Sequence, residues 1–449
     1  MDDFLAARAQ MGVSLGFHII FACIGMVMPF FMAVAHYNWL RTGDVCYKNI
    51  TRAWSRGVAI FFVTGAVSGT MLSFELGLLW PGFMKYAGPI IGMPFSLEGT
   101  AFFIEAIALG FYLYGWEKLN KWFHWYTGLL IGLSGLASGI LVVSANAWMN
   151  SPTGFIYENG RFSHINPWKA MYNAAWIPEA LHMILAAFVA TGFAVAGVHA
   201  WMLYRRKNTD FHLKAFRIAV SFAAIAALLQ PFSGDFAARS VAKLQPAKLA
   251  AMEGLFYTQS HAPLSMGGIW SATLPASGSD SIVYQLRYAI EIPDMLSILV
   301  HGKANAIVTG LDHIPKNEWP PVGVVHVAYQ IMVALGILLF LLAIISLCGV
   351  WKYRKWMHKS WFLKWHIIAI PAGFLAIEAG WTVTEVGRQP WIIDHIMRTA
   401  DAVTPMPGIV YTFYFFTWIY LMLSAMVIFL LYRQIKMVPV LYDVVPDKN

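Results

Sequence analysis

Nine long apolar segments, each free of lysine and arginine, constrain this chain more than any other feature of its sequence. A helix that rises 1.5 Å per residue needs about 20 apolar residues to cross the roughly 30 Å core of a bilayer. Inside lipid, only helices and closed barrels satisfy the backbone. The pattern therefore predicts an all-α fold class: a polytopic membrane protein with nine transmembrane helices. The nine segments cover residues 15–37, 57–78, 94–115, 125–148, 175–203, 218–236, 324–350, 365–385 and 410–432.

The composition agrees with a membrane protein and excludes other classes. Hydrophobic residues make up 59% of the 449-residue chain and charged residues only 12%, against roughly 25% charged in a typical soluble domain. This excludes an ordinary soluble globular protein and a disordered one. Cys23, Cys46 and Cys348 are isolated and form no CxxC or CxxCH motif. Nothing therefore supports a zinc ribbon, a disulfide framework or covalently attached haem.

Lysine and arginine concentrate in every second connection between the apolar segments. Basic stretches follow the first, third, fifth and seventh segments, for example Arg41 to Arg56 and Arg205 to Arg217, and the C-terminal tail is also basic. Cytoplasmic loops of membrane proteins carry the excess of basic residues. We therefore expect the N-terminus outside and the C-terminus in the cytoplasm. The net charge of +8 then reflects topology, and no nucleic acid partner is expected.

Hydropathy divides the chain into three parts. Residues 1–236 hold six predicted transmembrane helices, residues 237–323 form one long extracytoplasmic loop, and residues 324–449 hold three further helices and a cytoplasmic tail. The loop has no strong helical period and contains a stretch rich in glycine, serine and proline from Leu264 to Ser281. A connection of this length is usually functional or mobile, so the loop is a candidate functional segment.

Ionisable residues inside the apolar segments are candidate functional residues, because a charge near the bilayer centre costs at least ~2.5–3.5 kcal/mol. The segments contain carboxylic acids and histidines but no lysine or arginine. Glu98 and Glu105 are seven residues apart, as are Glu378 and Glu385, and seven residues make nearly two helical turns. Each pair therefore shares one helix face. Without a cation nearby, these carboxyls are expected to be protonated, to ligate a metal or haem, or to relay protons.

His182 in the fifth segment and Met332 in the seventh lie at matching depth, about seven and eight residues from the outer ends of their segments. An imidazole nitrogen and a thioether sulfur on two helices are one ligand pair of six-coordinate haem iron. A Met is more often part of the hydrophobic core, and a membrane His is as often satisfied by a neighbouring helix. These residues alone leave both interpretations open. His18, near the outer end of the first segment, is a further candidate ligand.

Several short motifs are spread over almost the whole chain. They are Gly16-Phe17-His18, Leu97-Glu98-Gly99, Ile104-Glu105, Ala145–Met149, Leu181-His182, Lys248–Glu253, Ile331-Met332-Val333, Glu378–Trp381 and Glu385–Trp391. Together with the nine-helix plan and the long loop between helices six and seven, these motifs resemble subunit I of the cytochrome bd-type quinol oxidases. The short loop is similar to that of the cyanide-insensitive branch of the family. The last motif is the longest and the most specific.

The resemblance implies a haem-containing subunit of a terminal respiratory oxidase. Such an enzyme oxidises quinol at the outer membrane face, reduces oxygen to water with cytoplasmic protons, and generates a membrane potential without extra pumping. The implied cofactors are two haem b groups and one haem d, although some short-loop relatives carry haem b in place of haem d. The resemblance also implies a multi-pass location in the lipid bilayer of the bacterial plasma (inner) membrane. The implied partners are a second membrane subunit (subunit II), which forms a heterodimer with subunit I, and a small single-helix subunit.

The same resemblance implies roles for residues around the haems. His182 and Met332 would ligate the low-spin haem b that first receives electrons. His18 and Glu385 would be the axial ligands of a high-spin haem b and of the oxygen-reducing haem, in an order that differs among family members. Trp381 would lie between haems.

Four further residues receive a role in proton transfer or quinol oxidation from the resemblance. Glu98 would lie beside the oxygen-binding haem, and Glu105, about 10 Å deeper along the same helix, would bring protons toward it. Lys248 and Glu253 would lie in the loop that oxidises quinol.

Two arginines are implied to offset haem propionates, and one position departs from the family pattern. Arg388, with Arg8, would balance the propionate charges. The family often has an arginine two residues before the methionine ligand, where this chain has Gln330. We therefore expect altered compensation of a buried propionate and a shifted potential for that haem.

Two other classes of protein share part of the pattern. A diheme b electron carrier linked to quinone would keep His182 and Met332 but would have no use for Glu98 beside a five-coordinate haem. A proton-coupled transporter would use the acids to bind substrate or protons, and paired broken helices in inverted repeats would favour it. We find no internal repeat of that kind, and the sequence favours the oxidase.

Overall fold

The computed structural model describes residues 1–158, 160–206, 209–273 and 283–442. Among these residues, nine helical segments are long and apolar enough to cross a membrane, as predicted. The prediction of a polytopic helical protein is confirmed. The segments are α1 (Asp3–Thr42), α2 (Val45–Leu79), α3 (Pro81–Tyr114), α4 (Lys121–Asn150), α6 (Trp176–Tyr204), α7 (Thr209–Leu244), α10 (Val322–Leu347), the pair α11 (Ser360–Ile368) and α12 (Ala372–Val386), and α14 (Ile409–Tyr442).

Polar side chains and prolines explain where several helices begin. Asp2, Asp44 and Asn120 each accept hydrogen bonds from backbone N–H groups in the first turn of α1, α2 and α4, which are the groups that a helix leaves unpaired. The eighth predicted span is interrupted, because α11 ends at Ile368 and α12 begins just after Pro371. Proline has no N–H for a helical hydrogen bond and is favoured only where a helix starts.

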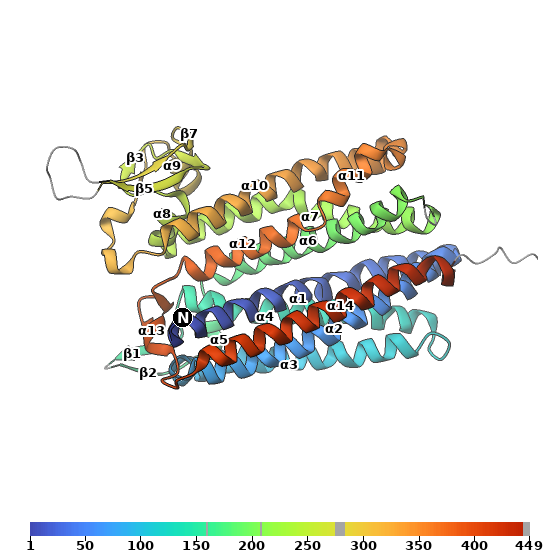
Figure 1. Cartoon of the computed structure of the whole chain (residues 1–449), viewed down its shortest axis with the longest axis horizontal. Coiled ribbons are helices and arrows are strands. Elements are labelled where there is room, and N and C mark those ends of the chain that lie inside the picture. The colour runs from blue at the N-terminus through green and yellow to red at the C-terminus, as the bar shows by residue number, and fades with distance from the viewer. Residues whose placement is uncertain (159, 207–208, 274–282, 443–449) are drawn as a thin grey trace, which may run out of the picture.

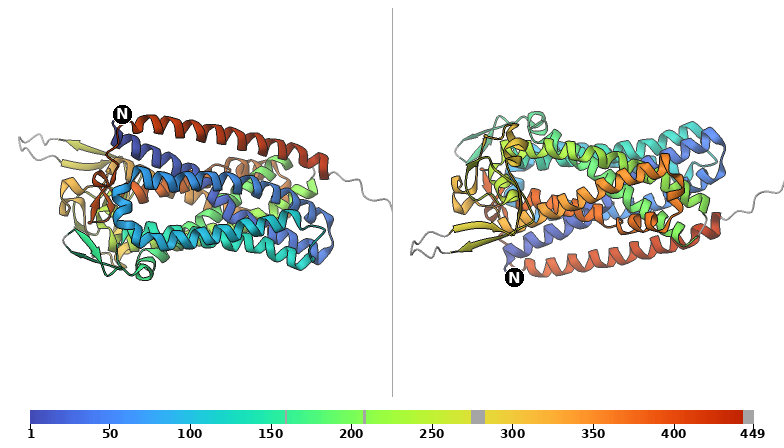
Figure 2. Two further views of the ribbon diagram at one scale, coloured as in Figure 1. Left: turned by 90° about the horizontal axis from the view of Figure 1, so that it is seen from below. Right: turned by 90° about the horizontal axis from the view of Figure 1, so that it is seen from above.

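The long helices form a single elongated bundle (Figure 1). Sequence neighbours α1 and α2, α3 and α4, and α6 and α7 pack side by side, and α10 packs on both α7 and α12. The N-terminus and the segment between α7 and α10 lie at the same end of the bundle, which we call the loop end, and α14 runs to the opposite end (Figures 1 and 2). The bundle therefore has two chemically distinct ends.

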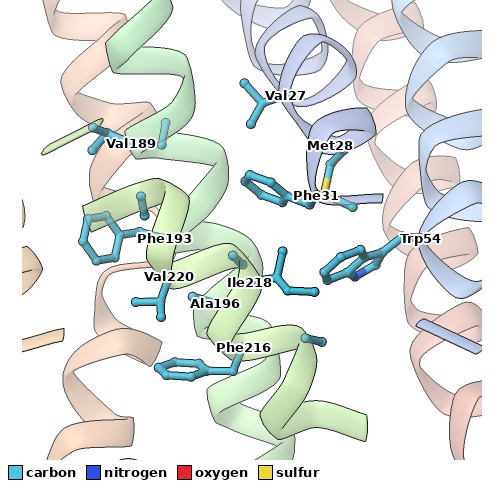
Figure 3. Close-up of a cluster of buried hydrophobic side chains, with 14 of the residues drawn as sticks. Val27, Met28, Phe31, Trp54, Val189, Phe193, Ala196, Phe216, Ile218 and Val220 are labelled. Carbon is cyan, nitrogen blue, oxygen red and sulfur yellow. The ribbon is translucent and has the colours of Figure 1, made fainter. Parts of the chain in front are cut away.

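The largest apolar core lies away from the loop end, mainly among α1, α2, α6 and α7, with contributions from α3, α10 and α11. Phe31, Trp54, Phe193 and Phe216 converge there from four of these helices (Figure 3). Glycines allow the closest approaches: a Cβ on Gly192 would lie 2.7 Å from the Cβ of Ala223. In membrane bundles, small residues replace the hydrophobic effect as the basis of tight helix packing.

Short strands outside the spans add to the predicted all-α fold. In the segment between α7 and α10, β3 (Gln259–Ser260) pairs with β8 (Ile307–Val308), β4 (Leu264–Met266) with β7 (Ile290–Ile292), and β5 (Ile269–Thr273) with β6 (Val283–Arg287), all antiparallel. The same segment contains α8 (Pro246–Glu253) and α9 (Met295–His301). Elsewhere at the loop end, β1 (Ile156–Glu158) pairs with β2 (Arg161–Ser163) and β9 (Trp391–Ile393) with β10 (Met397–Arg398).

The loop segment docks on the bundle through its own small core. Leu249, Leu296 and Leu311 from the segment pack with Val325 of α10 and Val383 of α12. The segment is therefore fixed against α10 and α12, the helices that carry Met332, Glu378 and Glu385.

Candidate functional site

The two predicted ligands of the low-spin haem lie on helices of one packed group, α6, α7, α10 and α12. His182 on α6 faces α7, where its Nδ1 lies 3.2 Å from Ser233 Oγ and 3.2 Å from Gln230 Nε2. Met332 on α10 faces α12, where a Cβ on Gly380 would lie 3.1 Å from its sulfur. Both residues lie in the half of their helix that is nearer the loop end.

His18 and Glu378 occupy a second position, where α1 meets α2 and α12. The His18 Nδ1 lies 2.9 Å from Ser68 Oγ, and a Cβ on Gly69 would lie 3.1 Å from the His18 ring. A Cβ on Gly16 would lie 3.1 Å from Glu378 Oε2, while Glu378 Oε1 is buried without a hydrogen-bond partner among the described residues. One turn along α12, Trp381 is half-buried and packs against the large apolar core.

Glu98 and Glu105 lie on the face of α3 that packs against α4. Ser138 donates a hydrogen bond of 2.9 Å to Glu98 Oε1. A Cβ on Gly135 would lie 3.4 Å from Glu105 Oε2, and only 7% of Glu105 is exposed. The two carboxyls thus form a short line that leads from the middle of α3 toward the end of the bundle opposite the loop end.

A buried polar cluster joins α4, α6, α8 and α12 at the loop end, and we call it the Arg388 cluster. Arg388 donates to Glu385 Oε2 at 2.6 Å and to Asn150 Oδ1 at 2.9 Å. Asn150 donates to Glu179 Oε1 at 2.8 Å. The members are Asn146, Asn150, Glu179, Gln245, Lys248, Glu385 and Arg388.

Lys248 belongs to this cluster, although it lies in the loop segment. Its Nζ donates to Asn150 Oδ1 at 3.2 Å, and only 3% of the residue is exposed. Burial, and then the nearby Arg388 charge, lower the pKa of Lys248, while the carboxylates of Glu179 and Glu385 oppose this shift. The two cations face two carboxylates, and the Nε of Arg388 has no partner among the described residues.

Glu253, at the other end of α8, lies in a different environment. The Tyr329 hydroxyl on α10 and the Ser265 backbone N–H are its hydrogen-bond partners, and its Oε2 is buried without a partner among the described residues. Burial raises the pKa of Glu253 to about 7, and the two hydrogen bonds oppose this shift. The structure therefore separates Lys248 and Glu253, which the resemblance places together in quinol oxidation.

Two other predicted residues make contacts that sequence reasoning missed. Gln330 donates to the Ser265 carbonyl and accepts from the Gly267 N–H, each at 2.9 Å. The Arg8 guanidinium lies over the Phe4 ring, 5.5 Å from its centre, and makes no ion pair among the described residues. Arg8 is therefore not part of the Arg388 cluster.

Several buried polar residues have no counterpart in the sequence prediction. The sequence contains a weak indication that Glu179 and Asn150 belong to the site. Asn150 directly follows the Ala145–Met149 motif, and Glu179 lies three residues before His182. Glu75 is 1% exposed and accepts from Gln10 Nε2 at 3.1 Å, and it had no signal beyond its position in an apolar segment. Only the packing of α1 against α2 brings Gln10 and Glu75 together.

The fold and these sites define a class: a multi-span helical membrane protein with imidazole, thioether and carboxyl groups, half-buried or buried, between its helices. The chain belongs to the cytochrome bd terminal oxidase subunit I family, whose model matches residues 6–439. It is subunit I of a cytochrome bd terminal quinol oxidase and therefore part of a quinol:oxygen oxidoreductase. This family implies haem cofactors and other subunits.

Comparisons with individual proteins agree with this assignment. The chain is 35% identical to a Bacillus subtilis protein provisionally named cytochrome bd menaquinol oxidase subunit I, over 98% of each chain. It is 30% identical to the Bacillus subtilis cytochrome bd ubiquinol oxidase subunit 1, over 97% of this chain and 94% of the other. The solved bd oxidase from Geobacillus thermodenitrificans superposes with a TM-score of 0.88 at 35% identity, covering 97% of this chain and 98% of the other.

Proposed function

We propose that this subunit oxidises quinol at the outer membrane face and reduces oxygen with protons drawn from the cytoplasm, so that turnover generates a membrane potential. The N-terminus and the loop segment would lie outside and the C-terminus in the cytoplasm. One observation carries the proposal. The histidine and thioether donors and the buried cations Lys248 and Arg388 gather toward the loop end, whereas Glu105 lies farther from it.

The donor set fits haem at the predicted positions. His182 and Met332 would hold a six-coordinate haem b, and His18 and Glu385 would hold one further haem each. Each donor faces a glycine of a neighbouring helix. A Cβ would lie 3.1 Å from Met332 or His18 at Gly380 or Gly69, and 3.7 Å from His182 at Gly234. We propose two haem b groups and a third haem of type d, or of type b as in some short-loop relatives. Bound haem supplies one-electron transfer and the iron that binds oxygen.

The Arg388 cluster would supply positive charge for haem propionates. Arg388 and Lys248 are buried, and burial of a charge is costly unless it is paired. In the described structure, Glu385 pairs with Arg388, and Asn150 accepts from Lys248 and donates to Glu179, whose charge favours the Lys248 ammonium. If Glu385 ligates an iron, propionates would take its place as partners of the two cations.

Glu105 and Glu98 would hold and pass the protons that oxygen reduction consumes. They share one face of α3, Glu98 is hydrogen-bonded to Ser138, and Glu105 is the deeper of the two. Each proton taken from the cytoplasmic side moves charge across the membrane, worth about 2.3 kcal/mol per 100 mV. Among the residues that the structure describes, no second set of buried ionisable groups suggests additional proton pumping.

The proposed partners are those that the family resemblance implies, and the exposed apolar faces leave surface on which they could pack. Phe74, Leu78, Phe103, Ile107 and Phe111 are exposed on α2 and α3, and such faces require lipid or another helix. We propose that a second membrane subunit and a small single-helix subunit complete the complex in the bacterial plasma membrane.

Spectra of the purified complex, reduced minus oxidised, with and without carbon monoxide, test the haem and oxygen chemistry. We expect low-spin haem b bands and a further band that carbon monoxide shifts. Absence of haem bands, or bands that carbon monoxide leaves unchanged, would contradict the oxidase assignment and leave the transporter or the diheme carrier. In proteoliposomes with a potential-sensitive dye, quinol addition should polarise the membrane. Oxygen consumption without a potential would contradict proton uptake from the cytoplasmic side.

A further inference from the structure

One face of α10 holds the loop segment through side chains at i, i+3 and i+4, a spacing that places them side by side on a helix. These residues are His326, Tyr329 and Gln330, and we call them the α10 clamp. His326 lies with Nδ1 2.8 Å from the Met252 carbonyl and Nε2 3.0 Å from the Gly267 carbonyl. Both partners are acceptors, so a neutral ring donates to only one of them.

Gln330 also hydrogen-bonds to the turn that follows β4. Its amide nitrogen donates to the Ser265 carbonyl and its amide oxygen accepts from the Gly267 N–H. Gly267 has a φ of 69°, a conformation that glycine adopts at no steric cost. Both backbone groups of this glycine therefore contact α10, the N–H through Gln330 and the carbonyl through His326.

Tyr329 connects the clamp to Glu253. Its hydroxyl and the Ser265 N–H are the hydrogen-bond partners of the carboxylate, whereas Oε2 is buried without a partner among the described residues. Glu253 is 3% exposed, and α8 ends directly after it at Gly254, which has a φ of 65°. Oε2 is therefore a buried acceptor that is still available for a hydrogen bond.

We propose that His326, Tyr329 and Gln330 are positioning residues of the quinol site, which hold Glu253 so that its Oε2 accepts a hydrogen bond, and then a proton, from a hydroxyl of a p-hydroquinone. This inference rests on the proposed role of Glu253 in quinol oxidation. Oxidation of one quinol to quinone releases two protons and two electrons. Glu253 would receive one proton at a time, and the two electrons would leave one by one toward the haem that His182 and Met332 would hold.

The clamp also places this site relative to Met332. Tyr329 and Met332 are three residues apart, about 4.5 Å along the helix axis, and Met332 faces Gly380 of α12. One rigid helix therefore carries both the residue that holds Glu253 and the predicted haem ligand. A change in the clamp would move the loop but would leave Met332 in place.

No further charged group faces Glu253 in the described structure. Tyr329 on α10 and the Ser265 backbone of β4 contact Glu253 directly. His326 on α10 contacts the carbonyl of the preceding residue, Met252. Lys248 on its own helix is turned toward Asn150. Loss of the Tyr329 hydroxyl removes a hydrogen bond that favours the carboxylate, and therefore raises the pKa of Glu253 further.

The test compares Tyr329→Phe and Gln330→Ala in the purified complex, with Tyr288→Phe as a matched control, because Tyr288 is 88% exposed in the same loop segment. Substrates are ubiquinol-1 and menadiol, with reduced tetramethyl-p-phenylenediamine as a donor that bypasses the quinol site.

We expect Tyr329→Phe to lower kcat for quinol by about tenfold, the effect of one lost hydrogen bond. The acidic limb of its pH profile should move to higher pH. Gln330→Ala should raise KM severalfold with a smaller change in kcat.

Both variants should keep the low-spin haem spectrum and the oxidation of the artificial donor. Wild-type kcat, KM and pH profile in both variants would overturn the inference, as would equal loss with quinol and with the artificial donor. Glu253→Gln separates this inference from the proposed function. If Glu253→Gln oxidises quinol at the wild-type rate, the quinol role of Glu253 is wrong. If it is inactive while Tyr329→Phe is unaffected, only the role of the clamp is wrong.

Discussion

The two ends of α8 carry buried charges in opposite surroundings. Lys248 lies among the ionised and amide groups of the Arg388 cluster, where its partners come from α4 and α12. Glu253 lies five residues later, and its partners are one hydroxyl and one backbone N–H. Lys248 is thus built into a charge network that is suited to propionates, whereas Glu253 keeps one free oxygen that is suited to a neutral hydroxyl. One short helix therefore carries at one end a residue suited to propionate compensation and at the other a residue suited to quinol binding.

The largest effect should come from breaking the Arg388 cluster. Arg388→Met removes the cation that pairs with Glu385 at 2.6 Å and leaves Lys248 as the cation near Glu179. Removal of one partner of a buried pair costs about 3–5 kcal/mol. We expect loss of haem, loss of oxidase activity and a lower unfolding temperature. Haem content and thermal unfolding of the purified complex are the measurements. Arg239→Met is the control, since its ion pair with Asp235 is half exposed, and equal damage in both variants would contradict the special role of Arg388.

Replacement of the thioether ligand should have the next largest effect. Met332→Leu keeps the apolar volume beside Gly380 but removes the sulfur, so the low-spin haem should become high-spin and quinol oxidation should stop. Optical and electron paramagnetic resonance spectra measure the change. Met357→Leu, a fully buried methionine of the large core, should leave both unchanged. A low-spin spectrum that survives Met332→Leu would refute this ligand.

The fold and the donor residues could be predicted because their signals are local. Apolar runs specify the helices, and His182, Met332 and Glu385 lie in short motifs. The Arg388 cluster could not be predicted, since Glu179, Asn150 and Lys248 come from three separate elements and meet only through packing. The strands of the loop segment are two to five residues long, too short for a reliable alternation pattern. The break between α11 and α12 did have a local signal, the proline at its end.

Loss of the deeper carboxylate should slow proton delivery without affecting assembly. Glu105→Gln keeps the shape of the side chain beside Gly135 but cannot release a proton, so oxygen consumption should fall by about 100-fold. Haem spectra should stay the same. Oxygen electrode rates and the reduced-minus-oxidised spectrum are the measurements. Glu318→Gln, in the loop segment, is the control, and a wild-type rate for Glu105→Gln would exclude Glu105 from the proton path.

A smaller and more selective effect should separate the two ends of α8. Glu253→Gln should impair quinol oxidation and remove the rise in rate with pH around 7, because its pKa of about 7 means that the carboxylate form increases through that range. It should spare the artificial donor. Lys248→Met should change the haem spectra or potentials as well as quinol oxidation, since its ammonium lies in the Arg388 cluster. Identical behaviour of the two variants would show that α8 serves one site.

The smallest effect should follow from restoring the family's arginine. Gln330→Arg would place a cation two residues from Met332, and a nearby positive charge favours the reduced, less positive haem, so the midpoint potential of the low-spin haem should rise. Redox titration measures it. The substitution also removes the acceptor for the Gly267 N–H, so KM for quinol should rise in the same variant.

Gln330→Ala is the matched control, because it breaks the same hydrogen bonds without adding charge. A potential that moves equally in both variants would assign the shift to displacement of the loop, and an unchanged potential in Gln330→Arg would contradict the link between this position and propionate compensation.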